Sequence, residues 1–221
     1  MNFYERTAAY IESLDTGNTE FLNKLEVYSL ETFVPIIKKP VQNFLKLILS
    51  IKKPKRILEV GTAIGFSSIL MAEYSGKDCH ITTIEKYEKR FPIAEENFLK
   101  SGYKDKITFI KGDATEVLEK LAHNGEKFDF IFMDAAKGQY INFFPNIMRL
   151  LDTDGVLISD NALQDNEIIQ SKYAVTRRNR TIHKRMREYL FSLTHNEELI
   201  TTIIPIGDGI TVSSRRNGNI L

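Results

Sequence analysis

Two short polar sequences could hold a hard divalent cation. Asp134 ends one run of apolar residues, and the pair Asp160-Asn161 ends the next run. If the two runs are neighbouring parallel strands, their carboxyl ends meet at one edge of the sheet and the three side chains converge. Carboxylate and amide oxygens, with no cysteine or histidine nearby, suit Mg²⁺ or Ca²⁺ better than zinc. The alternative is structural, with Asp134 capping a helix and Asp160-Asn161 forming a turn.

Lys137 could supply proton transfer at the same place. It follows Asp134 by about one turn of chain, which is near enough to accept a proton from a substrate hydroxyl. Only the neutral amine can do this, and both partial burial and a neighbouring divalent cation favour the neutral form. We therefore predict Lys137 as a general base.

A glycine-containing segment, Glu59 to Gly65, could bind a small ligand at the end of an earlier apolar run. Gly61 and Gly65 allow a sharp turn and a close approach of the backbone to a ligand. A helix starting near Ser67 would offer unpaired N–H groups, and Glu59 is placed to meet a cationic or amine-bearing ligand. Because the Gly-x-Gly-x-x-Gly pattern is absent, pyrophosphate binding and an NAD-linked dehydrogenase are disfavoured.

Acidic residues also follow the second and third apolar runs. Glu85 lies about twenty residues after Gly65, where a carboxylate can accept both hydroxyl groups of a ribose. Asp113-Ala114 follow the third run and could face an adenine amine. Each residue alone could be a surface charge or a turn residue. Their occurrence at successive strand ends favours a nucleoside-containing ligand.

An alternating α/β fold would bring these residues together. The apolar runs are short, continuous and rich in Ile, Val and Phe, which is typical of strands buried on both faces of a parallel sheet. Strands that alternate with helices predict a doubly wound sheet, closed here by a C-terminal hairpin. We expect strands over Arg56–Val60, Ile81–Glu85, Ile107–Lys111, Phe128–Met133 and Val156–Ser159, helices over Ser67–Tyr74, Lys89–Lys100, Thr115–Ala122 and Tyr140–Leu150, and a hairpin of Leu199–Ile206 with Ile210–Ser214.

The first fifty residues predict a helical cap. Helices are expected over Tyr4–Leu14, Glu20–Thr32 and Val41–Ile51, with Pro35 and Pro40 interrupting the region. The length of 221 residues suits one domain, residues 1–221, composed of the cap (1–50) and an α/β core (51–221). A net charge of +1, one cysteine, and the lack of a signal-peptide pattern or a bilayer-length apolar run lead us to expect a cytoplasmic protein.

These motifs together resemble the cation-dependent O-methyltransferases, the family of catechol and caffeoyl-coenzyme A O-methyltransferases. The most specific matches are Leu58 to Ser67, Asp129 to Lys137, and Asp160-Asn161. The resemblance implies a Rossmann-like class I methyltransferase with a seven-stranded, mostly parallel sheet, whose last two strands are the C-terminal hairpin. It also implies S-adenosylmethionine as methyl donor, Mg²⁺ as the cation, and a homodimer.

The resemblance assigns roles to individual positions. Asp134, Asp160 and Asn161 match the Mg²⁺ ligands, and Lys137 matches the general base. The residues implied in cofactor binding are Val34, Glu59, Gly61, Gly65, Ser67, Glu85, Asp113, Ala114 and Asp134. One departure is Ala135-Ala136, where catechol enzymes carry His-Trp, and this argues against a small catechol as the acceptor.

A basic segment, Lys172 to Arg187, contains seven positive charges and no acidic residue. With a whole-chain charge of +1, the rest of the protein is near −6. Together with Tyr173 and His183, the segment suits phosphate contacts and base stacking. It resembles a bacterial branch of the family that methylates 5-hydroxyuridine at the tRNA wobble position. The residues predicted to contact RNA are Arg177, Arg178, Arg180, Lys184 and Arg185.

Three alternatives for the basic segment remain open at this point. It could be a solvated helix, or it could bind the phosphates of coenzyme A. The enzyme could also act on a small catechol-like or phenolic acceptor of the caffeoyl-coenzyme A kind. A purely RNA-binding module is disfavoured, because it would have no need of Asp134, Lys137, Asp160 and Asn161.

Overall fold

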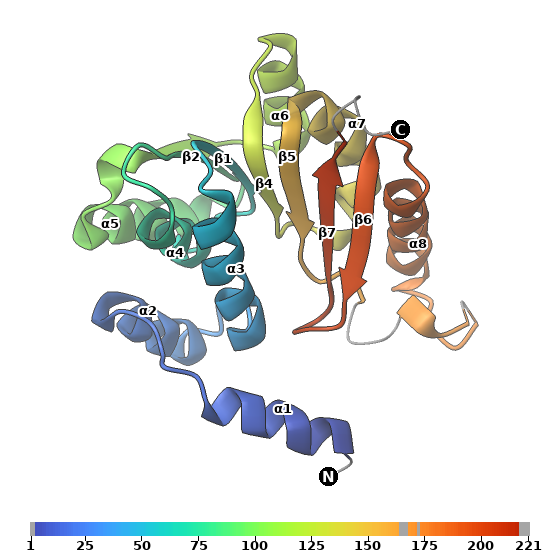
Figure 1. Ribbon diagram of the computed structural model, residues 1–221, viewed down its shortest axis with the longest axis horizontal. Helices are drawn as coiled ribbons and strands as arrows, with labels where there is room; N and C mark the ends of the chain where they lie inside the picture. Colours follow the sequence, from blue (N-terminus) through green and yellow to red (C-terminus); the bar gives the residue numbers. More distant parts are fainter. Residues whose placement is uncertain (1–2, 164–167, 172, 217–221) are drawn as a thin grey trace.

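A seven-stranded sheet runs through the molecule with helices on both faces (Figure 1). The computed structural model describes residues 3–163, 168–171 and 173–216. The strand order is β3-β2-β1-β4-β5-β7-β6, in which β1 to β5 are parallel and β7 runs antiparallel to both of its neighbours. The strands are β1 (Arg56–Val60), β2 (His80–Glu85), β3 (Ile107–Lys111), β4 (Phe128–Met133), β5 (Leu151–Ser159), β6 (Leu199–Ile204) and β7 (Ile210–Arg215).

The helices follow the strands in the order that the sequence predicts. Short 3₁₀ turns accompany them, among which are η1 (Glu88–Arg90), η2 (Lys104–Lys106) and η3 (Lys137–Gln139). The α-helices are α1 (Phe3–Ser13), α2 (Glu20–Glu31), α3 (Lys39–Lys52), α4 (Phe66–Tyr74), α5 (Phe91–Ser101), α6 (Ala114–His123), α7 (Tyr140–Leu150) and α8 (Arg180–Thr194).

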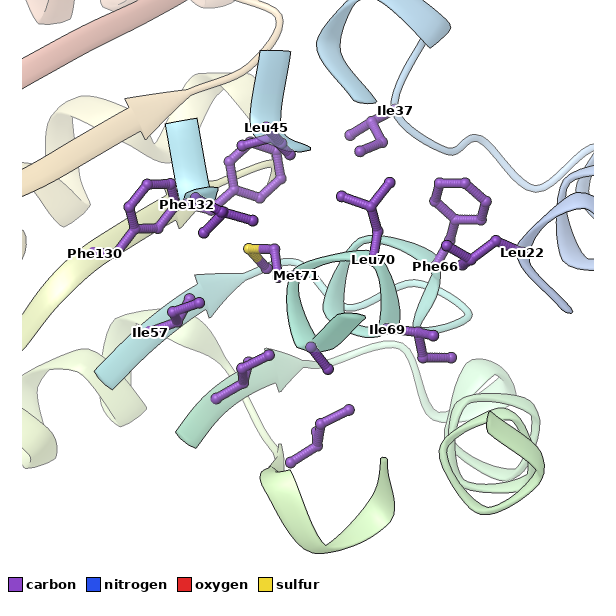
Figure 2. Close-up of a cluster of buried hydrophobic side chains, with 14 of the residues drawn as sticks. Leu22, Ile37, Leu45, Ile57, Phe66, Ile69, Leu70, Met71, Phe130 and Phe132 are labelled. Carbon is purple, nitrogen blue, oxygen red and sulfur yellow. The ribbon is translucent and has the colours of Figure 1, made fainter. Parts of the chain in front are cut away.

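The central strands are buried on both faces, because successive side chains of a strand point to opposite sides. In β1, Ile57 packs with α3, α4 and α5, whereas Leu58 packs with α6, α7 and α8. Figure 2 shows the first of these two clusters, where Phe130 and Phe132 of β4 lie among side chains of α3 and α4. This two-sided burial is why the strand sequences are continuous apolar runs, as expected for a parallel sheet.

The N-terminal cap packs on one face of the sheet. Helix α3 packs along α4, and Pro40 sits in its first turn, where proline costs no hydrogen bond. Helix α1 lies apart from the body of the molecule (Figure 1). Among the described residues, no helix combines the length and apolar character that a bilayer crossing needs.

The predicted fold class is confirmed, including the C-terminal hairpin. Most element boundaries agree with the prediction within two residues, and two differences are larger. Strand β5 begins at Leu151, earlier than the predicted start at Val156. The prediction started too late because Gly155 and its polar neighbours interrupt the apolar run. Helix α8 was considered only as one interpretation of the basic segment, and the structure shows it as a full fifteen-residue helix.

Candidate active site

A cavity of about 610 Å³ opens at the carboxyl ends of the parallel strands, where β1 and β4 lie side by side. In sheets of this kind, the strand order reverses at this point and leaves a crevice for a ligand. Nine of the residues predicted from the sequence line the cavity: Gly61, Ser67, Glu85, Asp113, Ala114, Asp134, Lys137, Asp160 and Asn161.

The two glycines of the first loop are needed for close packing within the protein. Gly61 has φ +108°, and a Cβ there would lie 1.9 Å from the backbone oxygen of Asp134. Gly65 has φ +87°, and a Cβ there would lie 2.6 Å from the Phe98 ring. Gly61 therefore lets β1 and β4 deliver their loops side by side, while Gly65 seats the loop on α5 behind the cavity wall.

The carboxyl group of Glu59 lies behind this loop and is fully buried, with 0% of the residue exposed. It accepts hydrogen bonds from the hydroxyl groups of Ser67, Ser68 and Thr83, the last at 2.5 Å. Burial raises the pKa of Glu59, and the three hydroxyl donors act against that shift. The sequence predicts that this carboxyl contacts the ligand. In the structure it instead fixes the start of α4, because the hydroxyl groups of Ser67 and Ser68 in the first turn of that helix donate to it.

Glu85 is held at the cavity edge by backbone donors. Its two carboxylate oxygens accept hydrogen bonds from the N–H groups of Ala63, Lys86 and Tyr87 at 2.8 to 2.9 Å. A carboxylate has about four lone-pair directions, so about one remains to accept from a ligand hydroxyl. The side chain is thereby fixed in direction before any ligand arrives.

Asp113 also lines the cavity, and it caps helix α6. Its side chain accepts a hydrogen bond from the N–H of Thr115 at 2.8 Å, and Lys86 lies 3.3 Å away. These contacts lower the pKa of Asp113, with the Thr115 N–H as the main cause. The adjacent Ala114 faces the same space.

The predicted cation ligands do converge at the ends of β4 and β5. Asn161 donates its side-chain N–H to Asp134 Oδ1 at 2.8 Å and its backbone N–H to Asp160 Oδ1 at 2.6 Å. Burial raises the pKa of both aspartates, and repulsion adds to the increase, from Glu59 at Asp134 and from Asp134 at Asp160. Asn161 has φ +60°, a left-handed conformation that asparagine tolerates better than most residues.

This group contains two carboxylates and one amide. In the described part of the chain, no cluster of three or more His, Cys, Asp or Glu side chains is arranged as a metal site. A cation here would therefore be held by Asp134, Asp160 and the Asn161 amide oxygen, with other oxygen ligands completing the shell. A half-turn of the planar amide would exchange its present N–H donor for that oxygen.

Two buried tyrosines hold the strand ends that carry these carboxylates. The Tyr140 hydroxyl accepts from the Ala135 N–H and faces the carbonyl oxygens of Met133 and Asp160, each at 3.2 Å. Tyr189 of α8 lies edge-on to Tyr140 at 5.5 Å, and its hydroxyl is 2.6 Å from Ser159 Oγ. The sequence analysis missed both residues, because a tyrosine within an apolar helical pattern is not distinguishable from ordinary core.

Another carboxylate, Asp208, enters the cavity from the turn between β6 and β7. Lys38, at the start of α3, makes an ion pair with it at 2.5 Å, so the cap and the hairpin meet across the cavity. Repulsion from Asp208 adds to the pKa increase of Asp134 and Asp160, while Lys137 opposes it. Gly207-Asp208-Gly209 joins the two strands of the predicted hairpin, and from the sequence alone it is only a turn. The position of an acidic residue between two glycines was the one sequence feature that could have suggested a functional role for Asp208.

Three predicted cofactor residues do not line the cavity. Glu59 and Gly65 lie behind the wall, and Val34 packs against the hydrophobic core while the next residues, Pro35 and Ile36, line the cavity. These three residues therefore lie behind the residues that line the cavity and contact them from the core side.

The predicted RNA-contacting residues differ in exposure. Arg177, Arg178, Arg180 and Lys184 are exposed, whereas Arg185 is half-buried, and Lys184 lies 3.6 Å from Glu188. Arg180 Nε donates to the carbonyl oxygen of Val175, and Arg185 Nη1 donates to that of Gly138 at 3.1 Å. Lys172 lies outside the described residues. Arg180, Lys184 and Arg185 belong to α8, which contacts η3, the turn that carries Lys137 into the cavity.

Comparisons with known proteins point in one direction. A family described as O-methyltransferase matches residues 12–216. Caffeoyl-CoA O-methyltransferase 1 of Eucalyptus globulus is 30% identical over 179 residues, which cover 78% of this chain and 71% of that protein. A Staphylococcus aureus protein provisionally assigned as a caffeoyl-CoA O-methyltransferase has a crystal structure that superposes with TM-score 0.85 at 27% identity, covering 97% and 100% of the two chains. The O-methyltransferase of Bacillus cereus in complex with SAH gives TM-score 0.83 at 22% identity, covering 94% and 96%.

Proposed function

The chain belongs to the O-methyltransferase family, and we propose that it methylates 5-hydroxyuridine at the wobble position of tRNA, giving 5-methoxyuridine. Family membership makes the protein an S-adenosylmethionine-dependent O-methyltransferase. The observation that supports an RNA acceptor is the group of exposed cations Arg177, Arg178, Arg180 and Lys184, which lie on α8 and in the segment just before it. Helix α8 contacts the turn that carries Lys137.

The methyl donor would occupy the part of the cavity formed by the first three strands. The cavity volume of about 610 Å³ lies within the range of about 300–1,000 Å³ usual for small-molecule sites. Glu85 would accept a hydrogen bond from a ribose hydroxyl, Asp113 and Ala114 would lie beside the adenine, and the loop from Gly61 to Ser67 would surround the methionine portion. Glu59 would act indirectly, because its carboxyl fixes the Ser67 hydroxyl.

Mg²⁺ would be held by Asp134, Asp160 and Asn161. The donor set fits, because a positive charge between the half-buried Asp134 and the buried Asp160 would offset their repulsion, and hard oxygen ligands suit this ion. Bound there, Mg²⁺ would polarise the acceptor hydroxyl and make it more acidic.

The protein's own part in the reaction is alignment and proton transfer. The methyl group moves from the donor sulfur to the acceptor oxygen, the carbon–sulfur bond breaks, and its electron pair stays on the sulfur. Lys137 would accept the hydroxyl proton, which requires its neutral amine. Holding donor and acceptor in line supplies several kcal/mol, by analogy with well-oriented intramolecular reactions.

The proposed acceptor suits this site chemically. The hydroxyl of 5-hydroxyuridine is enol-like and lies beside a carbonyl oxygen, so the base offers two adjacent oxygens as a catechol does. A single-stranded anticodon base can enter the cavity without opening a duplex. Ala135 and Ala136 at the acceptor side leave more space than the His-Trp pair of catechol enzymes.

A small phenolic acceptor is the second candidate, and the names of the similar proteins favour it. Both candidates are tested by incubating the protein with labelled S-adenosylmethionine, Mg²⁺ and either tRNA bearing 5-hydroxyuridine or caffeoyl-CoA. We expect label in the tRNA, none in matched tRNA with unmodified uridine, and none after EDTA treatment. Turnover of caffeoyl-CoA with no label in tRNA would reverse the assignment.

We also propose that two copies of the chain associate through the helical cap. Exposed apolar side chains include Tyr10 and Ile11 of α1, Leu30 of α2, and Phe33, which is 92% exposed. An isolated helix of this length is marginal in water, and a two-fold axis would bury both sets reciprocally. Light scattering should give the mass of two chains, and Phe33→Glu should give the mass of one. A wild-type mass of one chain would contradict the proposal.

A further inference from the structure

The basic helix α8 has an inner face that contacts the turn carrying Lys137. We propose that Arg185 is a positioning residue, which fixes the η3 turn so that the Lys137 side chain keeps its place in the cavity. The inference depends on the proposed function only for the role of Lys137 as proton acceptor. It also gives Arg185 a different role from the RNA contact that the sequence predicts.

The η3 turn needs support from outside. It spans three residues, Lys137 to Gln139, and the Gln139 N–H donates to the Ala136 carbonyl at 2.8 Å. So short a 3₁₀ turn fixes several backbone angles for very few hydrogen bonds, and it gains stability mainly from what packs against it. Its middle residue, Gly138, contributes no side chain to such packing.

Helix α8 supplies that support at Gly138. Arg185 Nη1 donates to the Gly138 carbonyl oxygen at 3.1 Å. Ile182, one turn earlier on the same side of α8, places its Cγ1 3.6 Å from where a Cβ on Gly138 would lie. Helix α8 therefore supports the turn through the Arg185 hydrogen bond and through Ile182, which fills the space beside Gly138. From α7, Asn142 donates its side-chain N–H to Gln139 Oε1 at 2.7 Å, so the Gly138 carbonyl is supported from α8 and the Gln139 side chain from α7.

The helix itself is firmly seated, so Arg185 reaches the turn from a fixed base. Met186 and Tyr189 are fully buried, and the Tyr189 hydroxyl is 2.6 Å from Ser159 Oγ, one residue before Asp160. A single helix thus contacts the chain beside Asp160 and the turn that carries Lys137. The position of the η3 turn relative to Asp160 is therefore set by one helix, and Arg185 makes the contact on the η3 side.

The position of Arg185 distinguishes this role from phosphate binding. Arg177 and Arg178 are exposed and extend outward, whereas Arg185 is half-buried and directed at a backbone carbonyl. Arg187 provides a matched control, because its Nη1 also donates to a backbone carbonyl, that of Ile168, at 3.2 Å. Arg187 lies on the same helix and makes the same kind of bond at a site away from η3.

The first test is hydrogen exchange of the full-length protein, and it does not depend on the acceptor. We expect Arg185→Gln to speed exchange of the Gln139 amide at least tenfold while amides of β4 and β5 keep wild-type rates. Arg187→Gln should leave the Gln139 amide unchanged, and Arg185→Lys, which retains one donor, should fall between. Unchanged exchange at Gln139 in Arg185→Gln would overturn the inference.

The second test is steady-state kinetics with whichever acceptor the wild-type enzyme turns over, tRNA or phenol. A misplacement of about 1 Å can cost up to about 10²-fold in rate, so Arg185→Gln should lower kcat about tenfold or more with KM near the wild-type value. Arg185→Lys should restore part of kcat. A raised KM for tRNA with unchanged kcat would instead make Arg185 a phosphate contact. Failure of the tRNA substrate alone would overturn the proposed function and leave the exchange result standing.

Discussion

At the ends of β2 and β3 the acidic side chains are compensated within the protein, whereas at the ends of β4 and β5 they face one another. Glu85 accepts three backbone N–H groups, and the Thr115 N–H lowers the pKa of Asp113. Asp134 and Asp160 have raised pKa values, because burial and repulsion from neighbouring carboxylates, Glu59 at Asp134 and Asp134 at Asp160, disfavour their charged forms. The two halves of one cavity therefore treat negative charge in opposite ways.

This difference indicates what each half is built to receive. A carboxylate whose charge is already balanced can accept hydrogen bonds from neutral hydroxyl and amine groups, which suits the ribose and adenine of the methyl donor. A pair of carboxylates that repel one another gains most from a positive charge, which suits a divalent cation. The cavity therefore has one region suited to a nucleoside and another suited to a chelated cation before any ligand binds.

The strongest way to break the comparison is to remove a carboxylate from the second half. We expect Asp160→Ala to lower turnover about 10³-fold, equal to about 4 kcal/mol, because polarisation of the acceptor hydroxyl would be lost. The affinity for S-adenosylmethionine, measured by calorimetry, should stay within about threefold of wild type, a change of less than about 1 kcal/mol in binding free energy. Near-normal turnover in EDTA would contradict the division of the cavity.

The reciprocal change is Glu85→Gln in the first half. In the wild-type protein, backbone N–H groups donate to both carboxylate oxygens of Glu85. The substitution replaces one of these oxygens with an amide N–H₂ group, which cannot accept a hydrogen bond. We expect a loss of about 2 kcal/mol in donor affinity, roughly 30-fold, from the unpaired donors. Mn²⁺ binding followed by electron paramagnetic resonance should be unchanged. Equal losses of donor and metal affinity would show that the halves are not independent.

Sequence patterns predicted the sheet and the cavity wall because both depend on local rules. A strand buried on both faces must be an apolar run, and the residues after it must lie at the carboxyl edge of the sheet. Gly61, Glu85 and Asp134 follow from that rule alone. The roles of most of these residues were then implied by the family resemblance.

The parts that sequence patterns could not predict depend on contacts between distant segments. Asp208 approaches Asp134 only because the hairpin folds back beside β5, and Lys38 meets it from the cap. Glu59 was interpreted as a ligand contact, since nothing in its sequence context shows that three hydroxyl groups surround it. Arg185 looked like its exposed neighbours until α8 was seen beside η3.

A pH experiment can sharpen the comparison without any substrate. Burial and repulsion raise the pKa of Asp134 to about 6 and that of Asp160 to about 7. Above pH 4 the unfolded chain releases these protons while the folded chain keeps them, so in EDTA stability should fall as pH rises from about 4 to 7. Asp160→Asn should remove most of this fall and raise the free energy of unfolding at pH 8 by on the order of 2 kcal/mol. A less stable variant at pH 8 would contradict the argument.

The smallest expected effect concerns the support of the second half. Tyr140→Phe removes the hydroxyl that joins the backbone at Met133 and Ala135 to that at Asp160. We expect Mn²⁺ affinity to fall about tenfold, because residues that orient metal ligands contribute about 10–100-fold. Donor affinity should not change, since the first three strands make no use of this hydroxyl. Tyr189→Phe is the matched control: its hydroxyl contacts the Ser159 side chain and no backbone group of the carboxylate pair, so it should weaken Mn²⁺ less. If the two variants weakened Mn²⁺ equally, the spacing of the two carboxylates would depend on general packing rather than on the Tyr140 hydroxyl.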